Sequence, residues 1–285
     1  MKVVILSGKG GAGKTTVAAS LSYVWRQEHV AVDMDVEAPN LHLFLKPQIT
    51  GSSEFTVEVP QVDESRCIAC RKCVELCNFS ALSLLGKKLL AFNEMCHSCG
   101  GCFRICPVEA LVRNNRAIGN ILTGEFAGVD QNSIAFVGGR LNIGEALSPP
   151  LIDAIAEYLH EKHESADIII DGPPGASCPA MSAIKDSDLI ILVAEPTVFG
   201  FHDMQIIYEA VADAGIPIAV VINKADELSV KVWEFCECKG VKVLAEIPFD
   251  KDLAQAYSNR QILAAYSKDM YKIFTELAAG VKCYV

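Results

Sequence analysis

The chain has 285 residues, of which 51% are apolar, and a formal net charge of −10. This size and apolar content allow one substantial α/β domain with a small additional domain, and leave little room for two full-sized domains. The acidic balance excludes nucleic-acid binding by bulk electrostatics, and no segment approaches the roughly 18 consecutive apolar residues of a membrane-spanning helix.

The first apolar stretch, residues 2–7, is too short for the core of a signal peptide and runs directly into a Gly-rich loop, as a first β-strand does. The twelve cysteines are therefore not expected to form the disulfides of a small secreted protein. We expect a cytoplasmic protein whose thiols are reduced or bound to metal.

The Gly-rich loop, "GKGGAGKT" at residues 8–15, fits the P-loop pattern G-x-x-x-x-G-K-[ST] between an apolar strand and a helical stretch. Its glycines allow backbone N–H groups to turn toward phosphate oxygens, and the helix N-terminus adds the positive end of its dipole. In this pattern Lys14 contacts the β- and γ-phosphates and Thr15 holds Mg²⁺, whereas a purely structural turn does not explain the Lys-Thr pair. The predicted nucleotide site includes Gly8, Lys9, Gly10, Gly11, Ala12, Gly13, Lys14, Thr15 and Thr16.

Further apolar runs alternate with helical patterns along the chain, at residues 30–33, 133–138, 167–171, 188–194, 217–222 and 241–247. Strands that are apolar throughout belong in a parallel sheet covered on both faces. The pattern predicts a doubly wound, mostly parallel α/β fold of the P-loop NTPase class, with ligands beyond the carboxyl ends of its strands. We assign residues 1–56 and 125–285 to this domain, and residues 57–124 to a small inserted α+β domain.

Three segments resemble the MinD/Mrp/ParA and nitrogenase iron-protein ATPases: "KGGAGKTT", with its second lysine, Lys9, and the switch-like segments "VDMDVEAPN" and "IIIDGPPG". The resemblance covers residues 1–50 and about 130–285. It implies an ATP-dependent homodimer in which Lys9 reaches the phosphates bound by the other subunit, with a solvated loop lysine as the alternative. It also implies that Asp35 orients the attacking water and that Asp33 belongs to the Mg²⁺ shell. Lys9, Lys14 and Asp35 are therefore the candidate catalytic residues.

Two later strand ends carry further candidate ligands. Asp171 ends one strand as a Walker B carboxylate does and would bind Mg²⁺ through water, although an Asp at a strand end is often a turn or cap residue. The following "DGPPG" would form a γ-phosphate-sensing hinge that includes Gly175. "VINKAD" presents Asn223, Lys224 and Asp226. N-K-x-D reads guanine in GTPases, whereas the family resemblance implies that Asn223 contacts adenine, which favours ATP and leaves GTP as the alternative.

Eight cysteines form two runs with the spacing C-x₂-C-x₂-C-x₃-C, and the second run repeats the first at an offset of 29 residues. This is the two-cluster bacterial ferredoxin pattern, in which the fourth cysteine of each run ligates the other cluster. Zinc is the rival metal, because paired C-x₂-C units also build zinc sites. We assign one [4Fe–4S] cluster to Cys67, Cys70, Cys73 and Cys106, and the second to Cys96, Cys99, Cys102 and Cys77.

Details around these runs are less regular. Asn78 replaces the proline that usually follows the fourth cysteine, which we expect to relax one turn, and His97 reads as a solvated neighbour. Cys178 lies seven residues after Asp171, at an offset that resembles a cluster-bridging cysteine of the nitrogenase iron protein, but the second cysteine of that bridge has no counterpart here.

The remaining features read as structural. The pair Cys236 and Cys238 resembles the C-x-x-C of Mrp-type carriers only loosely, and buried or half-buried free cysteine is the favoured interpretation. Cys283 gives no indication of a role. The stretch 268–280 places Met270 and Phe274 on one helical face with a polar face of mixed sign, which favours core packing over a basic membrane-binding helix.

The insertion follows the switch-like segment "DVEAPN", so movement of that segment could reach the clusters. We therefore expect a slow, dimer- or partner-activated ATPase that couples ATP to electron transfer or to metallocofactor assembly, with a redox or assembly protein as partner. The expected cofactors are ATP, Mg²⁺ and two [4Fe–4S] clusters. The alternatives are a MinD/ParA-like positioning ATPase and a GTP-using switch protein. No nucleic-acid partner and no stable membrane anchor are expected.

Overall fold

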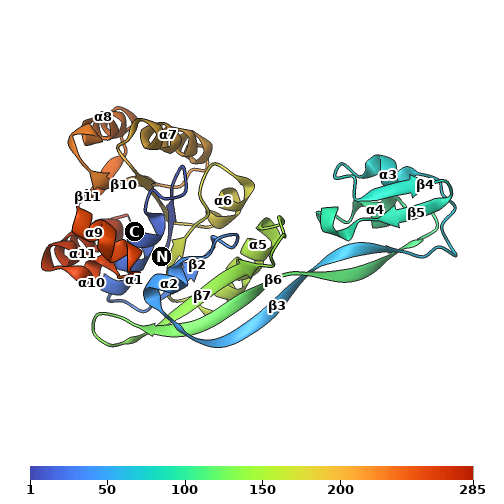
Figure 1. Ribbon diagram of the computed structural model, residues 1–285, viewed down its shortest axis with the longest axis horizontal. Coiled ribbons are helices and arrows are strands. Elements are labelled where there is room, and N and C mark those ends of the chain that lie inside the picture. Colours follow the sequence, from blue (N-terminus) through green and yellow to red (C-terminus); the bar gives the residue numbers. More distant parts are fainter. Residues whose placement is uncertain (285) are drawn as a thin grey trace.

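Seven parallel strands form the centre of the structure, and each occupies a stretch that the sequence predicts as a strand. The computed structural model describes residues 1–284 (Figure 1). Within this range, the large sheet has nine strands in the order β11-β10-β9-β1-β8-β2-β7-β6-β3. The predicted doubly wound, mostly parallel fold is confirmed. Its parallel strands are β1 (Lys2–Leu6), β2 (His29–Asp33), β7 (Ser133–Leu141), β8 (Asp167–Asp171), β9 (Leu189–Ala194), β10 (Ile218–Ala225) and β11 (Lys242–Pro248).

Helices cover both faces of this sheet, because successive residues of a strand point to opposite sides. In β1, Val4 and Leu6 belong to one buried core, and Val3 and Ile5 belong to the other. This two-sided burial explains why the strands read as continuous apolar runs. The first core is closed by α5 (Pro149–Lys162), α6 (Cys178–Ala183), α7 (Val198–Ala212) and α8 (Val230–Lys239). The second is closed by α1 (Lys14–Val24), α2 (Leu41–Leu45), α9 (Lys251–Ser258), α10 (Leu263–Tyr266) and α11 (Lys268–Lys282).

The C-terminal helix α11 packs into the second core, as its apolar face predicts. Met270, Phe274 and Leu277 are buried there, and Ile273 packs against them from a half-buried position. Within residues 1–284 there is no helix that combines the length and apolar character needed to cross a membrane.

A long antiparallel ribbon, β3 (Gln48–Val62) and β6 (Leu111–Ala127), leaves the main sheet and carries the cysteine-rich region at its far end (Figure 1). Residues 119–127 of β6 pair with β7, while residues 111–118 continue beyond the sheet and pair with β3 alone. These two strands were not predicted from the sequence as part of the sheet, because exposed polar residues interrupt their apolar residues. The proposed boundaries at 57 and 124 fall inside β3 and β6, so one continuous ribbon joins the two parts.

The cysteine-rich part has its own small core. Cys73, Leu82, Leu89 and Leu111 are buried together there. Its elements are α3 (Lys72–Leu76), the hairpin of β4 (Leu82–Leu85) and β5 (Lys88–Ala91), the 3₁₀ turn Asn93–Met95 and α4 (Gly101–Ile105).

The 29-residue sequence repeat is also a repeat of backbone conformation. Helix α4 begins and ends 29 residues after α3. Left-handed φ angles recur at the same offset: Ala69 and Ser98 have φ of 55° and 53°, and Arg71 and Gly100 have φ of 67° and 71°. A non-glycine residue in this region costs about 1–2 kcal/mol, so both halves hold a strained loop beside their cysteines.

Candidate functional site

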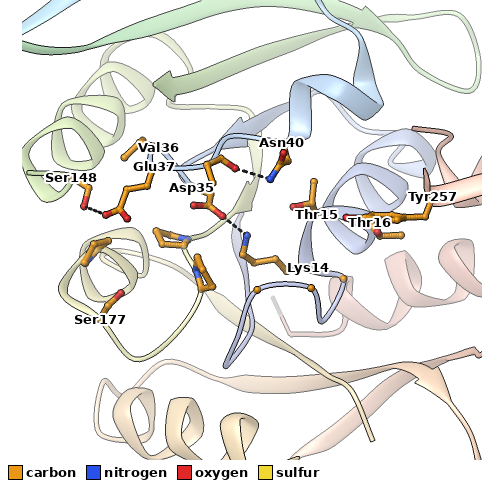
Figure 2. Close-up of a pocket in the computed structure, with 17 residues that line it drawn as sticks. Lys14, Thr15, Thr16, Asp35, Val36, Glu37, Asn40, Ser148, Ser177 and Tyr257 are labelled. Carbon is orange, nitrogen blue, oxygen red and sulfur yellow. Dashed lines mark hydrogen bonds and ion pairs between the residues drawn. The ribbon is translucent and has the colours of Figure 1, made fainter. Parts of the chain in front are cut away.

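The loops at the carboxyl ends of β1, β2 and β8 surround a cleft of about 280 Å³ (Figure 2). It brings together the predicted residues Lys14, Thr15, Thr16 and Asp35. Glu37 and Ser148 lie on one wall of the cleft and were not predicted from the sequence. Glu37 follows β2 and Ser148 precedes α5, and only the fold brings these two segments together. The cleft is lined by Gly10, Gly11, Gly13, Lys14, Thr15, Thr16, Asp35, Val36, Glu37, Ala38, Asn40, Ser148, Pro173, Pro174, Ser177, Pro179 and Tyr257.

The Gly-rich loop has the conformation that its glycines permit. Gly13 precedes α1 with φ of 100°, and a Cβ atom there would lie 2.0 Å from Asn223 Nδ2. The Asn223 side chain donates a hydrogen bond from this Nδ2 to the carbonyl of Ala12 at 2.8 Å. Asn223 therefore braces the loop from β10, and no residue larger than glycine fits at position 13.

Lys14 lies between two carboxylates at the bottom of the cleft. Its Nζ is 2.8 Å from Asp35 Oδ2 and 3.5 Å from Asp171 Oδ1. Burial by itself would lower the pKa of Lys14, but the charges of Asp171 and Asp35 outweigh burial and raise this pKa to about 12. The lysine is a fixed cation at the position where a P-loop lysine meets phosphate.

Asp33 holds the loop after β2 and does not line the cleft. Its Oδ1 accepts a hydrogen bond from the Asp35 N–H at 3.1 Å, and its Oδ2 accepts one from the Leu41 N–H at 2.9 Å. Burial, followed by the charge of Asp171, raises its pKa well above the usual range. The Asp33 carboxylate therefore orders the loop after β2, and the expectation that it belongs to a Mg²⁺ shell stays a prediction.

Asp171 has the character of a cation ligand. Its side chain is completely buried, and neither carboxylate oxygen has a hydrogen-bond partner among the described residues. Burial raises its pKa, and the charge of Lys14 opposes this rise. The Lys14 ammonium lies 3.5 Å from one oxygen of this buried carboxylate, which leaves room for a bound cation or water. Together with the Thr15 hydroxyl, the carboxylate provides the hard oxygen donors that Mg²⁺ takes. These residues fit Mg²⁺.

Lys9 lies beside the cleft and contacts a residue that the sequence analysis missed. Its Nζ is 3.2 Å from Glu195 Oε2, and it is one-third exposed. Lys224 Nζ lies 3.3 Å from the other oxygen of Glu195 and donates to the Gly11 carbonyl at 3.1 Å. Glu195 directly follows β9, and an acidic residue at a strand end is the same sequence pattern that identified Asp35 and Asp171 as candidates.

Gly175 and the proline-rich loop close the side of the cleft nearest β8. The Gly175 N–H donates to the Ser7 carbonyl at 2.8 Å, and the residue has a left-handed φ of 78°. Pro173 and Pro174 form part of the wall. The loop is thus bonded directly to the start of the P-loop.

A second hollow of about 390 Å³ adjoins the P-loop on its other side. The predicted residues Asn223 and Lys224 line it together with Gly11, Gly13 and Thr16 of the P-loop segment, whereas its other lining residues were not predicted. Asp226 does not line this hollow: its side chain accepts the Leu228 N–H at 2.8 Å and caps the turn after β10. The hollow is lined by Gly11, Gly13, Thr16, Glu195, Asn223, Lys224, Ile247, Pro248, Phe249, Asp250, Leu253, Ala254, Tyr257 and Leu263.

The eight repeated cysteines surround two small hollows in the inserted part. One is lined by Cys67, Cys70, Cys73 and Cys106. The other is lined by Cys77, Cys96, Cys99 and Cys102, with Cys73 at its edge. Each hollow therefore gathers three cysteines of one run and the fourth of the other. In residues 1–284, no three His, Cys, Asp or Glu side chains converge closely enough to hold one metal ion.

Backbone donors point at sulfur in both hollows. The Ala110 N–H donates to Cys106 Sγ at 3.3 Å, and the Ser98 N–H donates to Cys96 Sγ at 3.4 Å. Burial, aided by the charges of Cys96 and Cys99, raises the pKa of Cys102 to about 11. The sulfur atoms around each hollow, one of which accepts a backbone N–H, fit a cationic iron–sulfur core that would hold them as thiolates.

The other cysteines lie apart from these hollows. Cys236 is buried in the main core, and burial raises its pKa to about 11, which confirms the favoured structural interpretation for this residue. Cys238 is exposed, so the interpretation as buried or half-buried cysteine is wrong for this residue. Cys283 is also exposed, and so is Cys178 at the start of α6. His97 is exposed to solvent, as predicted, and stacks on the exposed Phe79 ring at a distance of 3.8 Å.

Known proteins are similar to this chain both as a whole and over a short ferredoxin-like stretch. The sequence profile of the CobQ/CobB/MinD/ParA nucleotide binding domain matches residues 3–263. An uncharacterized protein of Methanocaldococcus jannaschii is 31% identical over 100% of this chain and 98% of its own length. An uncharacterized ATP-binding protein of the same organism is 25% identical over 100% of this chain and 90% of its own. Ferredoxin-3 of Rhodobacter capsulatus is 31% identical over 21% of this chain and 84% of its own length.

Solved structures share the fold. The cell division ATPase MinD of Pyrococcus furiosus superposes with a TM-score of 0.57 at 22% identity, covering 100% of this chain and 99% of its own. MinD of Pyrococcus horikoshii, solved with Mg-ADP, has a TM-score of 0.57 at 20% identity, covering 98% and 95%. At these identities the likeness establishes the α/β architecture.

Proposed function

Because this chain belongs to the CobQ/CobB/MinD/ParA nucleotide-binding family, we propose that it is an ATP-hydrolysing iron–sulfur protein that couples ATP to electron transfer or to metallocofactor assembly. One observation carries this proposal: two four-cysteine hollows lie on a ribbon that is continuous with the sheet bearing the P-loop cleft. The partner is a redox protein or a cofactor-assembly protein, and the working form is an ATP-dependent homodimer.

In the nucleotide cleft, the Lys14 ammonium binds the β- and γ-phosphates. A phosphate at this position competes with Asp35 for the same cation, because Asp35 Oδ2 is 2.8 Å from Lys14 Nζ. Release of Asp35 from Lys14 frees its carboxylate to orient the attacking water. Thr15 and Asp171 hold Mg²⁺, and Asp171 does so through water.

Lys9 completes the site in the dimer. In the single chain its ammonium is held by Glu195, 3.2 Å away, at the edge of the P-loop. In the dimer this ammonium would exchange the half-buried Glu195 carboxylate for a phosphate of the other subunit. The lysine then stabilises charge that develops during phosphoryl transfer.

ATP is the favoured nucleotide over GTP. Asp226, which would read guanine in an N-K-x-D motif, caps a turn with its side chain and lies outside the second hollow. That hollow adjoins the P-loop and has Phe249, Leu253 and Tyr257 in its walls, which suit an adenine ring. The name of one full-length relative, an ATP-binding protein, supports the same choice.

The two cysteine hollows each hold a [4Fe–4S] cluster. Cys67, Cys70, Cys73 and Cys106 hold the first, and Cys77, Cys96, Cys99 and Cys102 hold the second. When bound, the clusters supply one-electron redox chemistry. The backbone N–H groups of Ala110 and Ser98 stabilise the charge on their sulfur ligands.

Anaerobic purification with iron, sulfide and zinc analysis, followed by ATP and GTP titration, tests this function. We expect about eight irons and eight sulfides per chain, absorption near 400 nm, and tighter binding of ATP than of GTP. A preparation with stoichiometric zinc and no such absorption would refute the iron–sulfur function, and preferential GTP binding would refute the nucleotide assignment.

A further inference from the structure

One arginine of the ribbon connects the second cysteine hollow with the main domain. Arg116, on β6, forms an ion pair through Nη1 with Glu145, and its Nη2 donates to the carbonyl of Cys96 at 3.2 Å. Both side chains are shielded from solvent, with 17% of Arg116 and 7% of Glu145 exposed. Arg116 therefore holds the backbone of a cluster ligand and a loop of the ATPase domain at the same time.

The other end of this contact reaches the nucleotide cleft. Glu145 Oε1 accepts hydrogen bonds from the N–H groups of Ala146 at 3.0 Å and Leu147 at 2.9 Å. The next residue, Ser148, is buried and donates its hydroxyl to Glu37 Oε1 at 2.8 Å. Glu37 and Ser148 both line the cleft, and Figure 2 shows their contact across its wall.

The contacts of Arg116 reach the second cysteine hollow rather than the first. Cys96, which lines only the second hollow, packs against the large core that also contains Leu147, whereas Cys67, which lines only the first, packs against the small core of the insertion. In the described part of the chain, no side-chain hydrogen bond or ion pair joins the cysteines of the first hollow to the segment 142–148.

We propose that Arg116 is a positioning residue that transmits the nucleotide state of the cleft to the second cluster and not to the first. The inference rests on the proposed function and specifies its regulation. A shielded, charge-assisted Arg–Glu pair is costly to break from one side, so a shift of the Ser148 segment must carry Arg116, and with it the Cys96 carbonyl. The two contacts of its planar guanidinium point in fixed directions, which a lysine cannot reproduce.

The test is a redox titration of the two clusters by EPR with Mg-ATP and with Mg-ADP. The variant Cys70→Ser, which alters a ligand of the first hollow only, assigns the two signals. In the parent we expect a nucleotide-dependent shift in the potential of the second cluster and none in the first. Arg116→Gln and Glu145→Gln should each remove at least half of that shift, and Arg116→Lys should not restore it.

Arg113→Gln is the matched control. Arg113 also pairs with a glutamate, Glu58, on the same ribbon, but this pair is exposed and makes no contact with segment 142–148. Any change that Arg113→Gln causes in a cluster potential should be equal with Mg-ATP and with Mg-ADP. The difference in potential between the two nucleotides should therefore stay as in the parent. If Arg116→Gln does not fold, Glu145→Gln decides, since the side-chain oxygen that remains in this variant can still accept the N–H groups of Ala146 and Leu147.

The outcomes separate the inference from the proposed function. A parent protein without clusters or without ATP binding would refute the function. Normal cluster content and ATP hydrolysis, with no shift at the second cluster, an equal shift at both, or a shift that survives both Arg116→Gln and Glu145→Gln, would overturn this inference alone.

Discussion

Lys14, the first residue of α1, and Asp35, which follows β2, form a buried ion pair with 2.8 Å between Nζ and Oδ2. The same ammonium is the group that the P-loop pattern assigns to nucleotide phosphates. On the proposed function, Asp35 and a bound phosphate compete for one cation, and we expect the two residues to have separable roles in binding and in hydrolysis.

Substitution of the two residues should separate these roles. Lys14→Ala should abolish ATP binding, because it removes the phosphate cation. Asp35→Asn should bind ATP as well as the parent or a few-fold more tightly, and should hydrolyse it about 100-fold more slowly. Calorimetric titration and single-turnover hydrolysis measure the two effects. Weaker ATP binding by Asp35→Asn would contradict the competition.

Asp171→Asn should stabilise the protein in the absence of nucleotide while it impairs Mg²⁺-dependent hydrolysis. Burial raises the pKa of Asp171 above its usual 3.8, so its charged form is disfavoured in the folded state. The stability cost of this charge is small below pH 3.8 and grows as pH rises toward the folded-state pKa. We expect a gain of about 1 kcal/mol at neutral pH, or roughly 2–4 °C in Tm.

Thermal melts of parent and Asp171→Asn between pH 4.5 and 8 measure this effect. The difference in Tm should widen with increasing pH. A variant that is less stable than the parent at pH 7 would mean that the attraction to Lys14 outweighs the burial of Asp171.

Lys9→Ala should retain ATP affinity within a few-fold and lose about 10²–10³-fold in hydrolysis rate, because the lysine acts on charge that develops in the transition state. The parent rate per chain should rise with protein concentration if the lysine acts in a dimer. Glu195→Gln is the control, since it breaks the pair of Lys9 within the chain but leaves the lysine available. Equal loss of hydrolysis in both variants would assign Lys9 to its own subunit.

Substitution of one cysteine in either hollow should remove the iron of that hollow and leave the iron of the other. Cys70→Ala and Cys99→Ala each alter one hollow only, and each should leave about four of the eight irons with one intact EPR signal. Cys178→Ala should retain all of the iron, because this exposed cysteine lies on α6 outside both hollows. Loss of iron from Cys178→Ala would show a cluster that neither hollow accounts for.

The sequence by itself determined the parallel sheet, the P-loop and the pairing of the cysteine runs. Local pattern is sufficient for these features. Two-sided burial makes parallel strands apolar throughout, the P-loop depends on consecutive residues such as Gly13 and Lys14, and a 29-residue repeat carries both the ligands and the left-handed turns beside them.

Only the tertiary structure decided which polar residues share a site. Asp33 and Asp35 are two residues apart at the end of the same strand, but Asp33 accepts the Leu41 N–H and does not line the cleft, while Lys14 holds Asp35 in it. Arg116 and Glu145 are 29 residues apart and carry no motif. Their contact arises because β6 lies beside β7 in the sheet, and pairing between distant strands is set by packing of the whole core, which no local window of sequence contains.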